Sequence, residues 1–86
     1  MAKNPIVLAV LDYANESDQF SSPGKNEKAK IVPSLDSLSD EAFVQFQSTL
    51  MAFMADRGVK FTFFPDNMRL AKTWKNVAAQ IAINQG

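Results

Sequence analysis

The sequence predicts a mainly α fold with three helices and one short extended segment. The helices fall at about residues 5–18, 40–57 and 67–84, and an extended aromatic segment falls at 59–64. Three observations lead to this prediction: the central helix carries start and stop residues, apolar residues recur at helical spacing, and 86 residues with few glycines and prolines fit one globular domain. A chain of this size buries only about 60% of its unfolded surface, so we expect one small core.

The first helix begins with a favourable pair of residues. Asn4 is a good N-cap, and Pro5 suits the first helical position because its missing N–H is not needed there. The apolar run at 6–11 is also short enough to be a buried strand, and periodicity does not settle such runs. The alternative fold is therefore α+β, with a small sheet made of residues 6–11, 30–32 and 59–64.

A polar connection follows the first helix. From about residue 21 to 30 the sequence is rich in Ser, Pro, Gly, Lys and Asn, which is typical of a mobile loop. We interpret this stretch as a loop inside a single domain at 1–86, and not as a boundary between two domains.

The central helix has both ends marked in the sequence. Ser39 can cap its first N–H groups, and Asp40 and Glu41 suit the positive end of the helix dipole. At the other end Arg57 suits the negative terminus, and Gly58 can adopt the left-handed conformation that ends many helices. The large apolar residues of this helix cover an arc of roughly 180°, which is wide for a surface helix. They are Phe43, Val44, Phe46, Leu50, Met51, Phe53 and Met54.

The extended segment 59–64 follows this helix directly. Its apolar side chains alternate with the period of a strand, and Pro65 favours extended geometry at Phe64. A single strand cannot satisfy its own backbone, so we expect it to pair with residues 31–32, with the run 6–11, or with the same segment of a second chain. The last of these partners would make a homodimer.

The last helix is expected to start at Asp66 and to run to about Asn84. One face gathers the apolar residues that we expect to pack on the central helix: Leu70, Ala71, Trp74, Val77, Ala78, Ile81 and Ala82. Residues 76–86 carry no charge, and Ile83 falls on the otherwise polar side. An uncharged final helix of this kind indicates burial or contact with a partner.

The charges are unevenly distributed although the formal net charge is zero. Residues 1–56 hold four basic and eight acidic side chains, while residues 57–86 hold five basic side chains and only Asp66 as an acid. We favour attraction between the two halves of the chain as the explanation. Recruitment of an acidic partner by the basic end is the alternative.

Composition argues against catalysis. The chain has no histidine and no cysteine, so it lacks the commonest general base, the commonest transition-metal ligand and any thiolate. Asp40 and Glu41 are the nearest pair of acids, and their place in the first turn of a helix already explains them. We predict no enzymatic activity, no catalytic residues, no metal and no cofactor.

The sequence also argues against a membrane protein. No apolar stretch approaches the roughly 18 residues that a spanning helix needs. The run at 6–11 is ended by Asp12, and no convincing cleavage site follows it. We therefore predict a cytoplasmic protein that does not associate with membranes.

Protein binding is the predicted function. Aromatic and methionine side chains are abundant, and such residues are typical of interfaces. Gln47 falls inside the apolar arc of the central helix, where its amide needs the backbone, water or a second helix as a partner. We predict a small accessory or inhibitor-type protein that binds a protein partner and self-associates. The candidate interface residues are Gln47, Met51, Phe61, Phe63, Phe64 and Ile83.

Nucleic-acid binding by the basic C-terminal third is the alternative function. Its candidate contacts are Arg57, Lys60, Arg69, Lys72 and Lys75. A helix-turn-helix needs a link of three or four residues, and the stretch 58–65 is longer. The helical wheel also points Trp74 toward the core and away from the lysines, so no stacking platform is evident.

Overall fold

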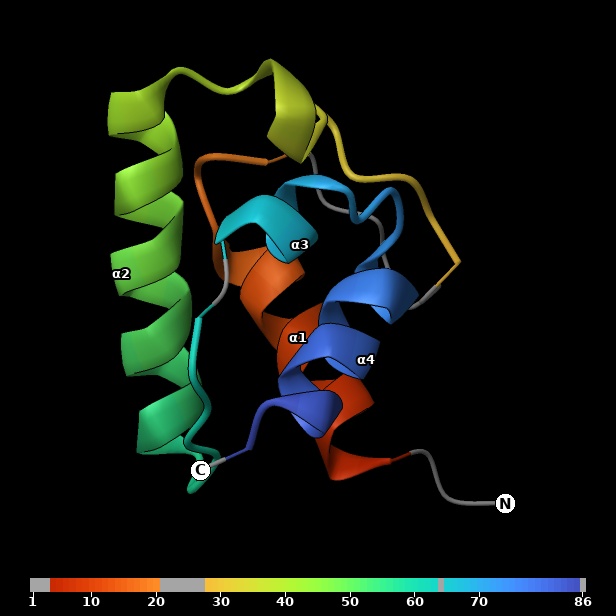
Figure 1. Cartoon of the computed structure of the whole chain (residues 1–86). Coiled ribbons are helices and arrows are strands. Elements are labelled where there is room, and N and C mark those ends of the chain that lie inside the picture. The colour runs from red at the N-terminus through yellow and green to blue at the C-terminus, as the bar shows by residue number, and fades with distance from the viewer. Residues whose placement is uncertain (1–3, 21–27, 64, 86) are drawn as a thin grey trace.

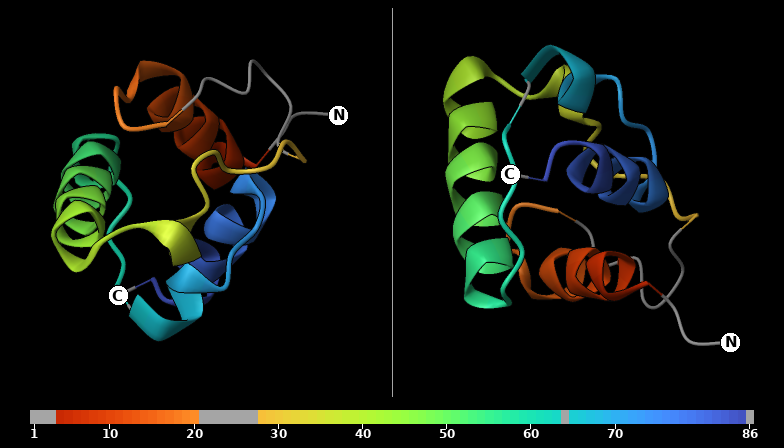
Figure 2. Two further views of the ribbon diagram at one scale, coloured as in Figure 1. Left: turned by 90° about the horizontal axis from the view of Figure 1, so that it is seen from above. Right: turned by 60° about the horizontal axis from the view of Figure 1, so that its bottom comes forward.

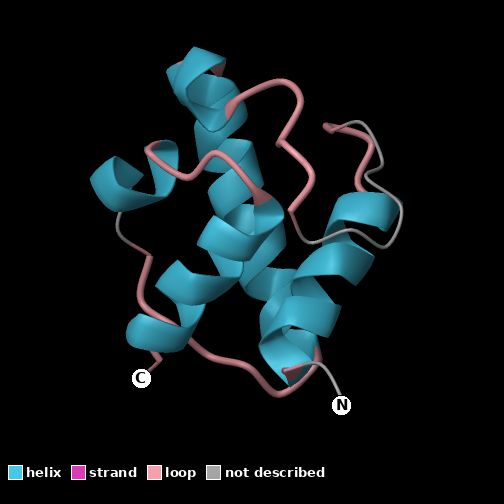
Figure 3. Cartoon of the chain, turned by 90° about the vertical axis from the view of Figure 1, so that its right-hand side faces the viewer, coloured by secondary structure: helices cyan, strands magenta, loops and turns pink. Residues whose placement is uncertain are grey.

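The computed structural model describes residues 4–20, 28–63 and 65–85 and shows a small bundle of helices (Figure 1). Its elements are α1 (Pro5–Glu16), the 3₁₀ turn η1 (Leu35–Ser37), α2 (Asp40–Asp56), the short α3 (Pro65–Arg69) and α4 (Trp74–Ile83). The described residues form no strand (Figure 3) and only two isolated β-bridges. The mainly α prediction is confirmed. The α+β alternative, with a sheet from 6–11, 30–32 and 59–64, is wrong for the described residues.

The helices form two groups. Helices α1 and α4 pack against each other, and α2 stands at one side of them (Figure 1 and Figure 2). The extended segment that leaves α2 runs back along that helix, between α2 and α4, in all three of these views. The other described elements therefore lie on one side of α2 (Figure 1).

Helix α1 starts as the sequence predicts and ends two residues earlier. The Asn4 side-chain oxygen accepts a hydrogen bond from the N–H of Ile6 at 2.8 Å, and Pro5 occupies the first turn. The helix ends at Glu16, where the N–H of Ser17 donates to the carbonyl of Tyr13. The apolar run at 6–11 is therefore helical.

Helix α2 has the ends that its sequence predicts. The Ser39 hydroxyl accepts from the N–H of Ala42 at 3.1 Å. At the other end Gly58 has a φ of +81°, its N–H donates to Ala55, and the N–H of Val59 donates to Met54 at 2.8 Å. These two bonds form a Schellman motif, which satisfies carbonyl groups left free at the helix end.

The prediction of one helix at 67–84 is wrong, because this region contains α3 and α4. Helix α4 begins at Trp74 with a capping box, in which the Thr73 hydroxyl accepts from the N–H of Asn76 and the Asn76 side chain accepts from the N–H of Thr73. The Asn76 side chain also accepts from the N–H of Lys72. Threonine and asparagine side chains compete with helical backbone bonds in this way, so the helix restarts at residue 74.

The backbone of the break between α3 and α4 pairs with the segment that precedes η1. Lys30 bridges Thr73, the N–H of Ile31 donates to Lys72 at 3.0 Å, and the N–H of Trp74 donates to Ala29. Backbone contacts thus hold residues 29–31 against residues 72–74. The rest of the predicted mobile loop at 21–30 falls mostly on residues 21–27, which lie outside the described residues.

The extended segment pairs with the end of the chain and not with the partners that we expected. Phe61 forms an isolated antiparallel bridge with Gln85, and the N–H of Thr62 donates to the carbonyl of Asn84 at 2.8 Å. The backbone need that suggested a second chain is therefore met in part within the monomer. Phe64 lies outside the described residues.

An aromatic cluster joins the helices in the core. The Trp74 ring of α4 is fully buried and contacts the Phe20 ring edge to face at 5.3 Å and the Tyr13 ring at 6.3 Å. Phe46 of α2 contacts Tyr13 at 6.0 Å and Phe20 at 5.4 Å. Because these four rings come from different parts of the chain, they hold α1, α2 and α4 in one core.

Phe63 extends this cluster, which leads to a first prediction. Its ring lies 5.7 Å from Phe43 and 6.1 Å from Phe46, and its side chain is buried. We expect Phe63→Ala to lower the free energy of unfolding by roughly 3 to 5 kcal/mol, because it leaves a cavity beside two rings. Urea unfolding measures this. An unchanged unfolding midpoint combined with loss of self-association would identify Phe63 as an interface residue instead.

The end of α2 leads to a second prediction. A Cβ atom built on Gly58 would meet no atom within 4 Å, so the cost of a substitution there comes from the backbone alone. We expect Gly58→Ala to destabilise the protein by roughly 1 to 2 kcal/mol, the cost of the left-handed conformation for an L-residue. Gly58→Asn should cost less, since asparagine tolerates this conformation. Equal stability of the alanine variant and the wild type would contradict this account.

Candidate functional site

Arg57 joins the end of α2 to α1. Its guanidinium donates to Asp12 at 2.8 Å, lies 3.6 Å from Glu16, and covers the ring of Phe53 at 4.5 Å. All three partners belong to this chain. Arg57 therefore has intramolecular contacts on its charged edge and on its flat face.

Arg69 joins α3 to the turn that precedes α2. Its guanidinium donates to the carbonyls of Leu35 and Leu38 and to the Asp40 carboxylate, and it lies 4.2 Å above the Phe43 ring. A continuous helix over residues 67–84 predicts Arg69 on the polar side, opposite Trp74, and this prediction is wrong, since the side chain is largely covered. The break in the predicted last helix explains the error, because it changes the direction in which residue 69 points.

Arg57 and Arg69 pair the basic part of the chain with its acidic part. Each of the three ion pairs among the described residues joins an arginine of the basic part to an acid of the acidic part. This supports attraction within the chain as the explanation. Lys60, Lys72 and Lys75 are exposed and form no ion pair with any described residue. The five candidate nucleic-acid contacts thus divide into two arginines that form ion pairs and three lysines that form none with the described residues.

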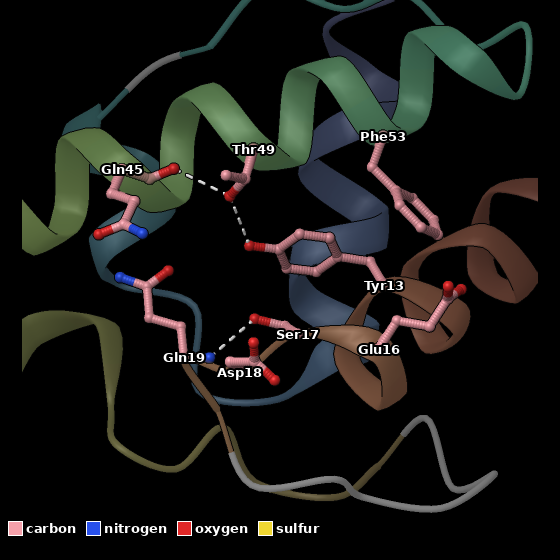
Figure 4. Close-up of a pocket in the computed structure, with 8 residues that line it drawn as sticks. All are labelled: Tyr13, Glu16, Ser17, Asp18, Gln19, Gln45, Thr49 and Phe53. Atoms are coloured by element: carbon pink, nitrogen blue, oxygen red, sulfur yellow. Dashed lines mark hydrogen bonds between the residues drawn. The ribbon is translucent and has the colours of Figure 1, made fainter.

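A pocket of about 310 Å³ lies between the end of α1 and the middle of α2 (Figure 4). Tyr13 and Phe53 form its aromatic wall, while Gln19 and Gln45 extend toward each other at one end. Hydrogen bonds hold its polar groups: the Gln19 amide donates to the Ala42 carbonyl at 2.7 Å. The pocket offers neutral hydrogen-bonding groups and, at its edge, the carboxylates of Glu16 and Asp18.

The fold shifts the protonation of the Tyr13 phenol. Its hydroxyl lies 3.0 Å from that of Thr49, which donates to the Gln45 carbonyl at 2.8 Å. Burial raises the pKa of Tyr13 above 10.0, and hydrogen bonding with Thr49 and Ser17 acts in the opposite sense. The phenol is therefore protonated at neutral pH and serves as a hydrogen-bonding group.

The outer side of α2 carries an exposed apolar strip. Val44 is 57% exposed and Met51 is 36% exposed, and Gln47 is partly buried beside them. We call Val44, Gln47, Met51 and Ala55 the α2 stripe, since their spacing of three and four residues places them on one side of the helix. No residue from 42 to 55 carries a charge. The core therefore covers only part of the wide apolar arc.

The most exposed large apolar side chains of the described residues lie on the turn after α3 and at the end of α4. Leu70 is 70% exposed and Ile83 is 74% exposed. We call Leu70, Lys75, Ala79, Ala82 and Ile83 the α4 face; all five are exposed. A groove of about 250 Å³ between α3 and α4 includes Leu70 and Ala79, and one of about 170 Å³ between α1 and α4 includes Lys75, Ala79 and Ala82.

The six candidate interface residues are thus divided by the structure. Gln47 and Met51 lie on the α2 stripe, and Ile83 lies on the α4 face. Phe61 and Phe63 are buried in the monomer, and Phe64 lies outside the described residues. Sequence reasoning missed Leu70, which we placed on the core side of a continuous helix. Thr73 and Asn76 were the signal for the break that turns Leu70 outward.

Comparison of the chain with protein-family models, curated proteins and solved structures found no match. Among the described residues, no group of three or more acidic side chains is placed to hold a metal ion. No helix in the same part of the chain has the length and apolar character needed to cross a bilayer.

The raised pKa of Tyr13 leads to a third prediction. Above about pH 10 the unfolded chain loses the phenolic proton while the folded chain keeps it, so stability should fall as pH rises toward the folded pKa. Tyr13→Phe removes this contribution. We expect the difference in stability between wild type and variant to shrink or reverse between pH 9 and 11.

Urea unfolding at several pH values measures this difference. All other titratable groups are the same in both proteins, so their effect cancels in the comparison. Parallel loss of stability in the two proteins would contradict a shifted pKa at Tyr13.

Proposed function

We propose that this chain is a small, non-enzymatic protein-interaction module that self-associates through the α2 stripe and binds a protein partner. The observation that carries the proposal is the exposed part of the apolar arc of α2, with Val44 and Met51 at its centre. A cytoplasmic location is part of the proposal.

The absence of charge on this part of α2 supports contact between two copies. Residues 42–55 carry no ionisable side chain, so two such faces meet without like-charge repulsion and without burying a charge. Ser48, Ala52 and Ala55 are small and exposed, which lets two helix backbones approach closely around the larger Val44 and Met51. A two-fold contact of this kind uses the same surface on both copies.

The charges at the two ends of α2 favour an antiparallel pair. A parallel pair brings the exposed Asp40 and Glu41 of both copies together, which is unfavourable. An antiparallel pair sets these acids against the other end of the partner helix, where one acid, Asp56, is exposed beside Lys60, and Lys60 forms no ion pair with a described residue. Gln47, at the edge of the stripe, then has a role in setting the register, as polar residues do in coiled coils.

The chemistry of the pocket between α1 and α2 supports a binding role. Its groups are amides, hydroxyls and two carboxylates, and its phenol, Tyr13, is held protonated at neutral pH. Such groups suit hydrogen bonding to a ligand or to a protein more than proton transfer at neutral pH.

Nucleic-acid binding has less support. Arg57 and Arg69 make their contacts within the chain, where carboxylates of this chain offset their charges. Lys60 lies after α2, Lys72 in the α3–α4 break and Lys75 in α4. Three lysines supply a smaller electrostatic term than the basic stripe typical of nucleic-acid-binding domains.

Self-association through α2 leads to a fourth prediction. We expect the wild-type mass, measured by sedimentation equilibrium up to about 1 mM chain, to rise from monomer toward dimer. In the double variant Val44→Asp and Met51→Asp, four carboxylates would meet at the two-fold contact, so dimerisation should weaken by about tenfold or more. Because both positions are exposed, circular dichroism should show an intact fold.

Leu8→Asp is the matched control. Leu8 is an exposed apolar residue of α1, 47% exposed, and lies on neither proposed surface. Its substitution should leave the dimer constant unchanged. A wild type that stays monomeric over this concentration range, or equal weakening by Leu8→Asp, would contradict self-association through α2.

A further inference from the structure

The α4 face has the shape of a docking surface for a helix. Its two grooves lie on either side of Ala79, which contributes to both. The groove next to α1 is lined almost wholly by apolar atoms of Ile6, Val7, Ala78 and Ala82, with Lys75 as its charged residue. Two depressions separated by a small residue can receive neighbouring side chains from one helix.

The size of the grooves indicates what they can hold. At about 250 and 170 Å³ they lie below the roughly 300 to 1,000 Å³ of typical small-molecule sites. They suit single side chains that anchor a larger partner. Leu70 and Ile83, each at least 70% exposed, extend the apolar surface beyond the grooves.

The charges around the α4 face indicate the charge of its partner. Lys72 and Lys75 are exposed and have no ion pair with a described residue, and no acidic side chain lines either groove. Arg69, the other basic residue nearby, is held by Asp40. The free positive charge next to the grooves therefore comes from two lysines, and it complements a partner with carboxylates beside its apolar residues.

We propose that the α4 face binds an acidic amphipathic helix of a second protein. Apolar side chains at helical spacing enter the two grooves and cover Leu70 and Ile83, and acidic side chains along one edge of that helix pair with Lys72 and Lys75. This assigns a surface and a partner chemistry beyond self-association. It uses residues separate from the α2 stripe, so either proposal can fail without the other.

The test selects the partner helix from a library displayed on phage. The library holds peptides of about 18 residues, five helical turns, with apolar residues fixed at i, i+4 and i+7 and all other positions random. The target is the full chain. We expect the recovered sequences to be enriched in Asp and Glu along one edge. Recovery of basic or charge-neutral sequences, or of no binding sequence, overturns the proposal.

Variants then test the surface with a recovered peptide synthesised with a fluorescent label. We expect the double variant Leu70→Ser and Ile83→Ser to weaken binding by about tenfold or more in fluorescence anisotropy, the scale of losing interface anchors. Lys72→Glu with Lys75→Glu should weaken binding of the acidic peptide and favour a version with lysine in place of its acids. Unchanged affinity in both variants overturns the proposal.

The α2 variant serves as the matched control. Val44→Asp with Met51→Asp should leave peptide affinity unchanged, whereas Leu70→Ser with Ile83→Ser should leave the dimer constant unchanged. Amide chemical shifts of the ¹⁵N-labelled wild type give a readout that needs no variant. We expect the peptide to shift residues of the α4 face and not those of the α2 stripe, and the reverse pattern overturns the assignment.

A nucleic acid is the competing occupant. Labelled single-stranded DNA and duplex RNA are measured under the same conditions over a series of salt concentrations. We expect either to bind at least about tenfold more weakly than the selected peptide. Tighter binding of a nucleic acid that is lost in Lys72→Glu with Lys75→Glu would assign these lysines to phosphate contacts and overturn the proposal.

Discussion

The structure depends on the burial of Trp74 among aromatic rings from distant parts of the chain. Edge-to-face pairs of this kind contribute roughly 0.5 to 1.5 kcal/mol beyond the burial of their area. Trp74 contacts Phe20 and Tyr13, and both of these rings contact Phe46, so one aromatic cluster connects α1, α2 and α4. The cost is local: the buried indole N–H has no hydrogen-bond partner among the described residues.

Electrostatic contacts complete this arrangement and determine which charges remain for other molecules. Arg57 and Arg69 each combine carboxylate contacts with a ring face, and so fix α2 to α1 and α3 to the start of α2. Such partly exposed pairs add little stability individually. Their larger consequence is that lysines, and not arginines, supply the free positive charge next to the α4 face. The proposed partner chemistry follows from this division.

Local signals made part of the fold predictable from the sequence. Asn4, Ser39 and Gly58 act through bonds to neighbours within a few residues, so the ends of α1 and α2 follow the prediction closely. The apolar arc predicted for α2 is wider than the part that the core covers, since Val44 and Met51 are exposed. The capping box at Thr73 is also a local signal. We missed it because the apolar residues keep their helical spacing on both sides of Thr73. Consequently Leu70, assigned to the core, became part of the α4 face.

Pairing of the extended segment with the chain end at Gln85 was not predictable, because isolated bridges carry no sequence pattern. Trp74 is the only tryptophan, so its fluorescence reports the central cluster directly. We expect a blue-shifted emission that acrylamide barely quenches. In urea the emission should shift to the wavelength of exposed tryptophan in the same transition in which helical circular dichroism is lost. Native emission at the wavelength of exposed tryptophan, with strong quenching while the helices are intact, would contradict the arrangement from which both proposed surfaces derive.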